Sequence, residues 1–286
     1  MTILDAIILG LVEGITEYLP VSSTGHLILT SWLLGLSDDA AQKQSIDSFN
    51  IIIQGGAILA VLGLYWKRVQ SMVKGLAGRD PAGRALFIKI VLAFLPAAIL
   101  GVLFDDVIEE RLFRPIPVLI ALGGGGVLLL ALAPTIRSLV SREANESDDF
   151  SNLPYRAAIA IGFMQAIAMW PGTSRSMVTI LGGILFGLSP RRAAEFSFLL
   201  GLPTLGGACC YKLLKAGKDD PAAFLASLGG PIPVAVGIAV AAISAAIAVK
   251  WLVGYLSRGG FAAFGWWRVA VAAALGAAIF SGKMTL

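Results

Sequence analysis

Long apolar runs alternate with short polar stretches along most of this chain. Segments 67–84, 105–115 and 135–154 are the clearest polar or turn-rich separators. Helices are the expected form of the apolar runs, because hydrocarbon offers backbone N–H and C=O groups no outside partner and the runs lack the alternation of barrel strands. A helix crosses a bilayer with about 20 residues. Six runs are long enough to do so, at about 49–66, 86–104, 115–133, 193–214, 232–253 and 264–281.

Two further apolar regions are interrupted by polar residues. Residues 3–36 contain two glutamates, a proline and the sequence SSTGH, and residues 157–188 contain a glutamine, a proline and the sequence GTSRS. Each apolar arm is too short to cross a bilayer comfortably, and irregular polar backbone is tolerated at membrane depth only where it lines a protein cavity. We therefore predict an all-α integral membrane protein with six transmembrane helices plus two re-entrant helix–loop–helix hairpins, each of which returns to the side it entered.

The two interrupted regions resemble each other. Gly10 and Glu13 in the first correspond to Gly162 and Gln165 in the second, and each region then reaches a proline and a turn rich in Ser, Thr and Gly, with a one-residue slip between the copies. One hairpin and three spans per half invert the second half relative to the first, which is an inverted-topology repeat. The predicted organisation is a single polytopic membrane domain, 1–286, with repeats at about 1–134 and 154–286.

Composition supports a membrane location. The chain is 57% hydrophobic and 14% charged, whereas soluble domains carry roughly 25% charged residues. The net charge of +4 does not indicate nucleic-acid binding, because the basic residues lie at the ends of apolar runs. Two adjacent cysteines in an apolar run predict no disulfide framework, and a single histidine excludes a His-rich zinc cluster. Four consecutive glycines, 123–126, favour close helix packing over ligand binding.

Basic residues predict the orientation of the chain. If the segment after the first long run is cytoplasmic, 13 Lys and Arg residues lie on the cytoplasmic side and seven on the other. Cytoplasmic segments carry the excess of Lys and Arg in membrane proteins. We therefore expect both termini outside, the first hairpin entering from the outer face and the second from the cytoplasmic face.

Glu13 and Glu17 are the first residues with candidate chemistry. They are four residues apart, so they share one face of a helix, where two like charges are unfavourable. An acid within the membrane costs at least about 2.5 kcal/mol. Either one is protonated or paired with a distant arginine for structure, or the pair binds a divalent cation or acts as acid and base. We favour the functional interpretation.

The sequence after Pro20 has the character of a phosphate site. Ser22, Ser23, Thr24 and Gly25 stand where a second helix must start, and they supply an N-cap, hydroxyl donors and free backbone N–H groups. His26 ends this run. A lone histidine is more commonly a packed core residue, but its position here favours a role in the site.

The second loop adds a cation. Arg175 is permanently charged in an otherwise apolar region, and its planar fork suits phosphate. Thr173, Ser174 and Ser176 place hydroxyls beside it. Arg175 could also be the structural partner of one of the glutamates, and such a pair could open onto a substrate. The chain has no Walker A, GxSxG or HExxH motif, and a Ser–His intramembrane protease would leave the acid pair and Arg175 unexplained.

The segments EGITEYLPVSSTGH (13–26) and QAIAMWPGTSRS (165–176) resemble the bacterial undecaprenyl-diphosphate phosphatases of the bacitracin-resistance (BacA) type. The resemblance covers essentially the whole chain, and Met177 stands where the family usually has glycine. It implies a multi-pass hydrolase of the bacterial cytoplasmic (inner) membrane. Such an enzyme converts undecaprenyl diphosphate to undecaprenyl phosphate, recycles the lipid carrier for peptidoglycan synthesis, confers antibiotic resistance and depends on a divalent cation (Mg²⁺ or Ca²⁺).

The resemblance also implies the roles of individual residues. The implied catalytic residues are Glu13, Glu17, Ser23, His26 and Arg175. The expected phosphate-binding residues are Ser22, Thr24, Gly25, Thr173, Ser174, Arg175 and Ser176, and the expected metal ligands are Glu13 and Glu17. The nucleophile stays open between Ser23, His26 and a water.

Other functions fit the same pattern less fully. The alternatives are a polyprenyl-phosphate transporter or flippase, alone or as a second activity, and a structural membrane protein with polar helix contacts. We expect a pocket open to the outer (periplasmic) face, contacts with membrane lipid and a polyprenyl diphosphate, and no nucleic-acid partner. A homodimer is compatible with this interpretation.

Overall fold

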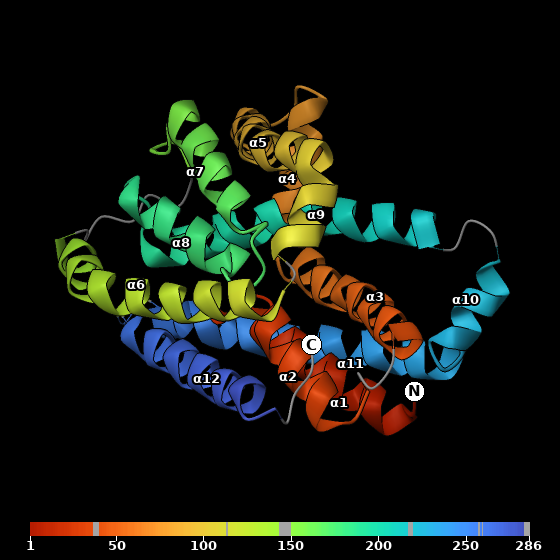
Figure 1. The fold of residues 1–286 in the computed structure, drawn as a ribbon. Helices are drawn as coiled ribbons and strands as arrows, with labels where there is room; N and C mark the ends of the chain where they lie inside the picture. Colours follow the sequence, from red (N-terminus) through yellow and green to blue (C-terminus); the bar gives the residue numbers. More distant parts are fainter. Residues whose placement is uncertain are drawn as a thin grey trace.

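The computed structural model describes residues 1–36, 40–112, 114–142, 150–216, 220–256, 258 and 260–282, and the regular structure in these residues is entirely α-helical. The arrangement of the helices is shown in Figure 1. In chain order they are α1 (Ile3–Thr16), α2 (Ser23–Leu33), α3 (Ala40–Leu64), α4 (Trp66–Leu76), α5 (Pro81–Leu112), α6 (Pro115–Arg142), α7 (Tyr155–Ile167), α8 (Arg175–Leu185), α9 (Pro190–Ala216), α10 (Pro221–Ser227), α11 (Pro231–Leu256) and α12 (Ala262–Phe280).

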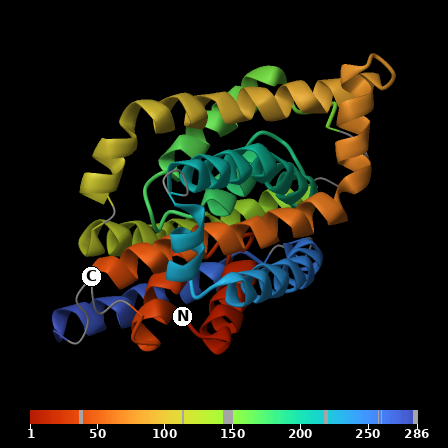
Figure 2. The ribbon, with the colours of Figure 1, turned by 90° about the vertical axis from the view of Figure 1, so that its right-hand side faces the viewer.

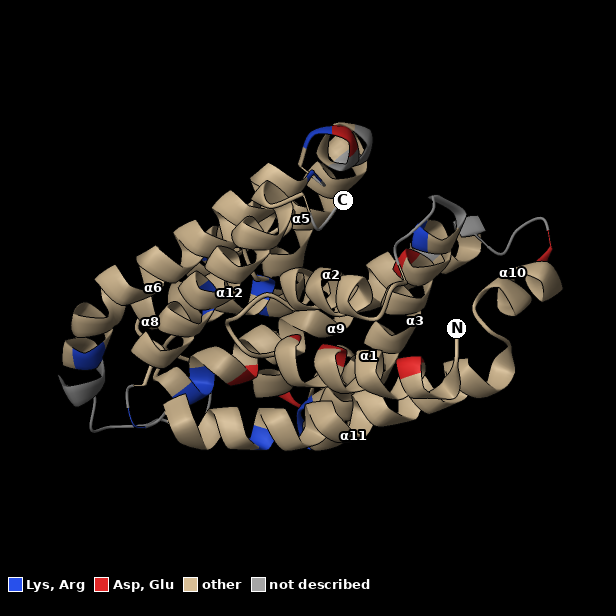
Figure 3. Cartoon of the chain, turned by 60° about the horizontal axis from the view of Figure 1, so that its bottom comes forward, with Lys and Arg blue, Asp and Glu red and all other residues tan. Residues whose placement is uncertain are grey.

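Six of these helices are long and apolar enough to cross a bilayer, which confirms the predicted number of spans. Even the shortest, with 19 residues, is about 28 Å long at the usual rise per residue. Most of the helical surface is tan in Figure 3, because few charged side chains lie along the helices. The protein is therefore an integral membrane all-α protein. Its spans are Gln42–Leu64, Pro81–Phe104, Pro115–Leu139, Pro190–Tyr211, Pro231–Leu256 and Ala262–Phe280.

The polar separators predicted from the sequence are partly helical. Helix α4 occupies most of segment 67–84, and α5 continues to Leu112 across what we expected to be a break. In α4 the apolar Trp66, Val73 and Leu76 are exposed while Met72 and Gly75 are buried against the neighbouring helix. The segment is polar on average, so we predicted a separator there and missed this amphipathic pattern. The pattern is typical of a helix that lies at a membrane interface.

A tight turn joins α4 to α5. Asp80 stands just before Pro81, and its carboxylate accepts the Ser71 hydroxyl hydrogen (2.6 Å) and the Gly83 N–H (2.9 Å). These two hydrogen bonds hold the pKa of Asp80 below its ordinary value. A Cβ at Gly83 would come within 2.0 Å of the Ser71 carbonyl oxygen, so the turn needs glycine there.

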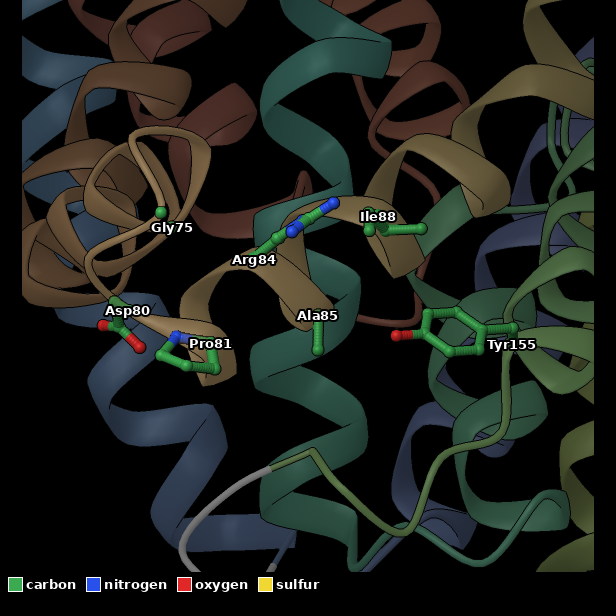
Figure 4. A pocket seen from close by; sticks show the side chains of 8 residues that line it. Gly75, Asp80, Pro81, Arg84, Ala85, Ile88 and Tyr155 are labelled. Carbon is green, nitrogen blue, oxygen red and sulfur yellow. The ribbon is translucent and has the colours of Figure 1, made fainter.

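A cavity of about 330 Å³ lies beside this turn (Figure 4). In the close-up, the Tyr155 hydroxyl on α7 points toward Ala85 of α5. None of the residues predicted for the site lines this cavity. Its lining is Gly75, Gly78, Asp80, Pro81, Arg84, Ala85, Ile88 and Tyr155.

The short helices pack among the long ones. Helix α1 lies along α11, α7 lies along α5, and α8 lies against α9, while α12 runs beside α6 (Figure 1). Figure 2 shows α5 passing over α9. Every residue of α8 from Ser176 to Ile184 is buried. The chain therefore places the second polar loop, which precedes α8, deep inside the protein.

The glycine run in α6 makes close helix contacts, which confirms the prediction for 123–126. A Cβ at Gly125 would lie 2.2 Å from the Arg268 guanidinium, and one at Gly126 would lie 2.9 Å from the Gly265 carbonyl oxygen on α12. A Cβ at Gly124 would meet nothing within 4 Å. The run thus brings α12 and its arginine against α6.

This difference predicts opposite effects for two adjacent substitutions. We expect Gly125→Ala to destabilise the protein by about 1–3 kcal/mol, because the new methyl group overpacks against Arg268. Gly124→Ala should be neutral or stabilising by up to about 1 kcal/mol, because alanine is the better helix former in open space. Thermal unfolding of the two detergent-solubilised variants measures this. Equal midpoints would contradict the packing role of Gly125.

Candidate active site

The first polar loop begins as a continuation of α1. Glu17 keeps helical backbone angles, and its N–H donates to the Glu13 carbonyl oxygen (2.9 Å), so the two carboxylates share a face as predicted. Gly14 lets α1 approach α11 closely, since a Cβ there would lie 2.4 Å from the Ala241 carbonyl oxygen. The result is that Glu13 is 1% exposed and Glu17 is 7% exposed.

Both loops turn at a strained serine. Ser22 and Ser174 have φ angles of +72° and +74°, and they are the residues with positive φ other than glycine among those the structure describes. Each lies twelve residues after the corresponding glycine, Gly10 or Gly162. Such a conformation costs about 1–3 kcal/mol in a residue other than glycine and is found most often at functional sites. The two loops therefore share an unusual backbone turn at matching positions.

The two serines differ in their capping of the following helix. Ser174 Oγ accepts the Met177 N–H (3.2 Å) and so caps α8. Ser22 stands at the N-cap position of α2 but makes no side-chain capping bond, so the cap predicted for the first loop is present only in the second. Met177, where the resemblance leads us to expect glycine, contributes its backbone N–H here, and its side chain is buried in the core.

Glu17 joins the two loops. Its Oε1 accepts from Arg175 Nη2 (3.0 Å), and its Oε2 accepts the Ser23 hydroxyl hydrogen (2.6 Å). Arg175 and Glu17 side chains are 9% and 5% exposed. The structure thus brings together a carboxylate, a hydroxyl and a guanidinium that are 158 residues apart at their most distant.

Arg175 is held by more than its ion pair. Nη1 donates to the Ser197 carbonyl oxygen (2.9 Å), and the guanidinium lies 5.6 Å from the centre of the Tyr18 ring. A Cβ at Gly201 would lie 2.9 Å from Nη1, so this glycine leaves room for the guanidinium. Tyr18, Ser197 and Gly201 were not predicted for the site, because nothing in their local sequence marks them as neighbours of a distant arginine.

One hydroxyl of the second loop reaches the first loop. Ser176 Oγ donates to the Leu19 carbonyl oxygen (2.9 Å) and lies 3.0 Å from Ser174 Oγ. Thr173 is buried and its N–H donates to the Trp170 carbonyl oxygen (3.1 Å), a contact within the second loop. The bond from Ser176 to Leu19 joins the loops from the two halves of the chain, as the Glu17–Arg175 pair does.

The remaining residues predicted for the first loop lie at the start of α2. Gly25 packs against α6, where a Cβ would lie 3.2 Å from the Leu122 side chain, and Thr24 is half-buried.

Neither carboxylate oxygen of Glu13 has a donor in hydrogen-bonding geometry within the described residues, although the side chain is buried. The Gln54 side chain is close enough to interact with it as a donor, and Glu17 and Arg175 act on it through their charges. No group of three His, Cys, Asp or Glu side chains in the described part of the chain could hold a metal ion by itself. A magnesium ion needs only one or two carboxylates when substrate phosphates supply the other ligands. The orphaned Glu13 carboxylate and Glu17 therefore fit a cation that binds with a phosphate.

His26 has both ring nitrogens hydrogen bonded. Its Nε2 accepts the Trp267 indole N–H (2.7 Å), and its Nδ1 lies 2.8 Å from the Ser22 carbonyl oxygen. Because an indole nitrogen only donates, the imidazole proton is on Nδ1 and is donated to Ser22. Trp267 was not predicted for the site, since a tryptophan in an apolar helix carries no such signal.

Arg268 corrects the use of the basic residues as topology markers. Arg268 is one of the 13 basic residues counted on the cytoplasmic side, but it lies inside α12 and is 0% exposed. Its Nε donates to the Leu122 carbonyl oxygen (3.1 Å), and its Nη2 donates to those of Ala121 (3.0 Å) and Gly172 (2.7 Å). Removing it from the count leaves the excess on the same side.

Comparison with known proteins identifies the family. The model of the family described as "Bacitracin resistance protein BacA" matches residues 6–274. The chain belongs to the BacA family. This agrees with the resemblance carried by 13–26 and 165–176, the two segments that form the interlocked loops.

Three BacA relatives show how far the likeness extends. The undecaprenyl-diphosphatase of Sorangium cellulosum is 44% identical over 269 residues, which are 94% of this chain and 84% of that protein. The undecaprenyl-diphosphatase of Cereibacter sphaeroides is 43% identical over 285 residues, 98% of each chain. That of Pseudomonas putida is 43% identical over 270 residues, 94% of this chain and 91% of its own.

Proposed function

We propose that this chain hydrolyses undecaprenyl diphosphate to undecaprenyl phosphate and inorganic phosphate in the bacterial cytoplasmic membrane, and so recycles the lipid carrier for peptidoglycan synthesis. Membership in the BacA family and relatives named undecaprenyl-diphosphatase support this activity. The observation that carries the chemistry is the position of the buried Glu17 carboxylate, which lies between the Arg175 guanidinium and the Ser23 hydroxyl.

The direct test is phosphate release from undecaprenyl diphosphate by the purified protein with magnesium. We expect turnover, with one phosphate and one undecaprenyl phosphate formed per substrate. A correctly folded wild-type protein that releases no phosphate would refute the proposal, and a transporter or flippase would then be the better interpretation.

Arg175 would bind the diphosphate first, and Glu17 would then act as the base. The Arg175 fork matches the geometry of phosphate oxygens, so the diphosphate would replace Glu17 as its partner. Positioning and charge stabilisation supply most of the catalysis in phosphoryl transfer. Once released from the ion pair, Glu17 would still hold the Ser23 hydroxyl hydrogen and be placed to accept its proton.

Ser23 is the nucleophile that the geometry favours. Its Oγ would form a bond to the terminal phosphorus while the bond from that phosphorus to the bridging oxygen breaks, and undecaprenyl phosphate would leave with the bridging oxygen. Glu17 would take the hydroxyl proton and pass it to the product phosphate or solvent. Water would then attack the phosphoserine, and Glu17 would take the proton of this water and return it to the Ser23 oxygen. His26 would position the loop, because both its nitrogens are already bonded.

Glu13 and Glu17 would hold the divalent cation, Mg²⁺ or Ca²⁺. When bound, the cation would neutralise charge on the phosphate oxygens. The feature that supports this role is the buried Glu13 carboxylate, whose oxygens have no donor in hydrogen-bonding geometry among the described residues.

A metal titration tests the role of Glu13. We expect a chelator to abolish activity and added Mg²⁺ or Ca²⁺ to restore it. Glu13→Gln should raise the cation concentration needed for half-maximal activity by at least about tenfold, since even an outer-shell partner is worth that much in metal affinity. Glu110→Gln, which changes an exposed glutamate on α5, is the matched control. An unchanged titration of Glu13→Gln would remove Glu13 from the metal site.

The two interrupted regions are proposed to form re-entrant hairpins in inverted repeats, at about 1–134 and 154–286. Two features support this. Ser22 and Ser174 share a rare backbone conformation at the same distance from Gly10 and Gly162. In addition, α1 packs along α11, and α7 packs along α5. If α1 corresponds to α7 and α5 to α11, these are equivalent pairs in the two halves, as an inverted repeat requires.

The excess of basic residues supports both termini on the outer side. In that orientation the first hairpin, which carries Glu17 and Ser23, enters from the outer face, and the site would open to the periplasm. A reporter enzyme that is active only after export, fused to the C-terminus, should therefore be active. An inactive reporter on a stable fusion would reverse the orientation. Light scattering of the solubilised protein would show whether it is a monomer or the homodimer that is compatible with the sequence.

A further inference from the structure

Two adjacent residues of α12 contact the two loops separately. The Trp267 indole N–H donates to His26, at the start of the helix that follows the first loop. Arg268 Nη2 donates to the carbonyl oxygen of Gly172, in the second loop. Neither residue belongs to the proposed chemistry, and both are far in sequence from the groups they hold.

Arg268 is buried without a carboxylate partner in the part of the chain that the structure describes. Its three donations all go to backbone carbonyl oxygens, two on α6 and one in the second loop, and Nη1 has no partner among the described residues. Burying a cation in this way is costly. A methyl-sized residue would have filled the space that Gly125 leaves open for the guanidinium. Gly125 leaves the space and Arg268 supplies the hydrogen bonds that connect α6, α12 and Gly172.

Trp267 acts on the first loop through His26. The indole N–H donates to Nε2, so the imidazole carries its proton on Nδ1 and donates it to the Ser22 carbonyl oxygen. Ser22 is the strained residue of this loop and directly precedes Ser23. The preceding residue is also a tryptophan, and Trp266 and Trp267 are 65% and 54% exposed, but the indole N–H that donates to His26 is that of Trp267. The indole of Trp267 therefore fixes the His26 ring by one hydrogen bond, and the His26 ring fixes the turn at Ser22 by another.

We propose that Trp267 and Arg268 are positioning residues that set the spacing between the two phosphate-binding loops. Trp267 fixes the first loop through His26, and Arg268 fixes the second through Gly172. Because the residues are adjacent on one rigid helix, the distance between Ser23 and Arg175 follows from the position of α12. This inference rests on the proposed function and assigns the two residues no contact with the substrate.

The first experiment uses the single histidine of the chain. Nitrogen-15 NMR of protein labelled at histidine reports which ring nitrogen of His26 carries the proton. We expect the Nδ1–H form in the wild type and in Trp266→Phe, and a mixture of both forms in Trp267→Phe, which keeps an aromatic ring but loses the N–H donor. A Trp267→Phe spectrum like that of the wild type would overturn the role of Trp267.

Kinetics show whether that bond matters for catalysis. Trp267→Phe should lower kcat about tenfold, the effect of one lost hydrogen bond, with KM within about twofold of the wild type. Trp266→Phe should keep the wild-type kcat. The NMR result is independent of activity, so an inactive wild type would refute the proposed function while the NMR spectra would still decide the role of Trp267. An active wild type with an unchanged Trp267→Phe kcat would refute the inference alone.

The second experiment displaces Arg268 in two ways. Gly125→Ala should push the guanidinium away from its carbonyl oxygens. Arg268→Lys keeps the charge, but its single ammonium nitrogen lacks the planar fork with which the arginine reaches three carbonyl oxygens. Both should lower kcat by about 10–100-fold, because small misplacement of reacting groups has effects of this size, while His26 keeps its Nδ1–H form. Gly124→Ala should retain the wild-type kcat. If either folded variant turns over at the wild-type rate, Arg268 has no positioning role.

Discussion

Replacement of Arg175 by alanine is expected to lower kcat/KM for undecaprenyl diphosphate by about 10³-fold or more, the range that an arginine contributes at a transferring phosphoryl group. The guanidinium is buried between Glu17 and the Ser197 carbonyl oxygen, so it is already desolvated and oriented before substrate arrives. Its loss removes preorganised positive charge from a site where water cannot replace it. It also leaves Glu17 without its cation.

Lysine should rescue this variant only in part. Arg175→Lys keeps the charge but loses the planar fork, and we expect it to recover about 10-fold of the loss, because a point charge cannot bind two phosphate oxygens bidentately. Arg79→Ala, in an exposed turn, is the matched control and should behave as wild type. Vanadate inhibition should weaken in parallel with kcat/KM if Arg175 binds the transferring group.

The competing interpretation makes Arg175 a structural partner of Glu17 alone. It predicts a lower unfolding midpoint for Arg175→Ala together with normal turnover of the molecules that remain folded. A monodisperse Arg175→Ala protein with wild-type turnover and normal vanadate inhibition would establish that interpretation and remove Arg175 from the mechanism.

Replacement of Ser23 by alanine is expected to lower kcat by about 10⁶-fold, because removal of a nucleophile leaves only the contributions of binding and charge stabilisation. The hydroxyl donates its hydrogen to Glu17 at 2.6 Å in the resting structure, so the base that would accept the proton is in place. Ser227→Ala, on the exposed helix α10, is the control and should retain full activity.

An acid-quenched single turnover should trap phosphate on Ser23. Glu17→Gln should slow hydrolysis of the phosphoserine, and peptide mass spectrometry would locate the modification. If labelled water oxygen enters the released phosphate and no phosphorylated residue is trapped in either protein, direct attack by water replaces the serine mechanism. A phosphate trapped on His26 would instead reassign the nucleophile.

The membrane made much of this fold predictable from the sequence. A bilayer allows few forms of spanning segment, so the six apolar runs identified the six spans, with ends that differ by up to seven residues. The breaks in 3–36 and 157–188 were also visible, because polar residues and proline interrupt otherwise apolar segments. The shared face of Glu13 and Glu17 followed from local helix geometry alone.

Local patterns failed where amphipathicity or helix length mattered. Helix α4 lies in a segment that looked like a polar separator, because its charged and apolar residues alternate with the helical period around a low mean hydropathy. Helix α5 continues to Leu112 beyond its apolar run. Backbone hydrogen bonding continues a helix past the point where the hydrophobic signal ends.

The sequence by itself determined the class of the protein, the two loops and the residue types that could handle phosphate, because these depend on composition and on neighbours within a few positions. Only the tertiary structure decided which groups meet. Glu17 pairs with Arg175 across 158 residues, and Trp267 reaches His26 across 241. The partner of a buried polar side chain is selected by the packing of helices distant in sequence, and no periodicity along the chain encodes that choice.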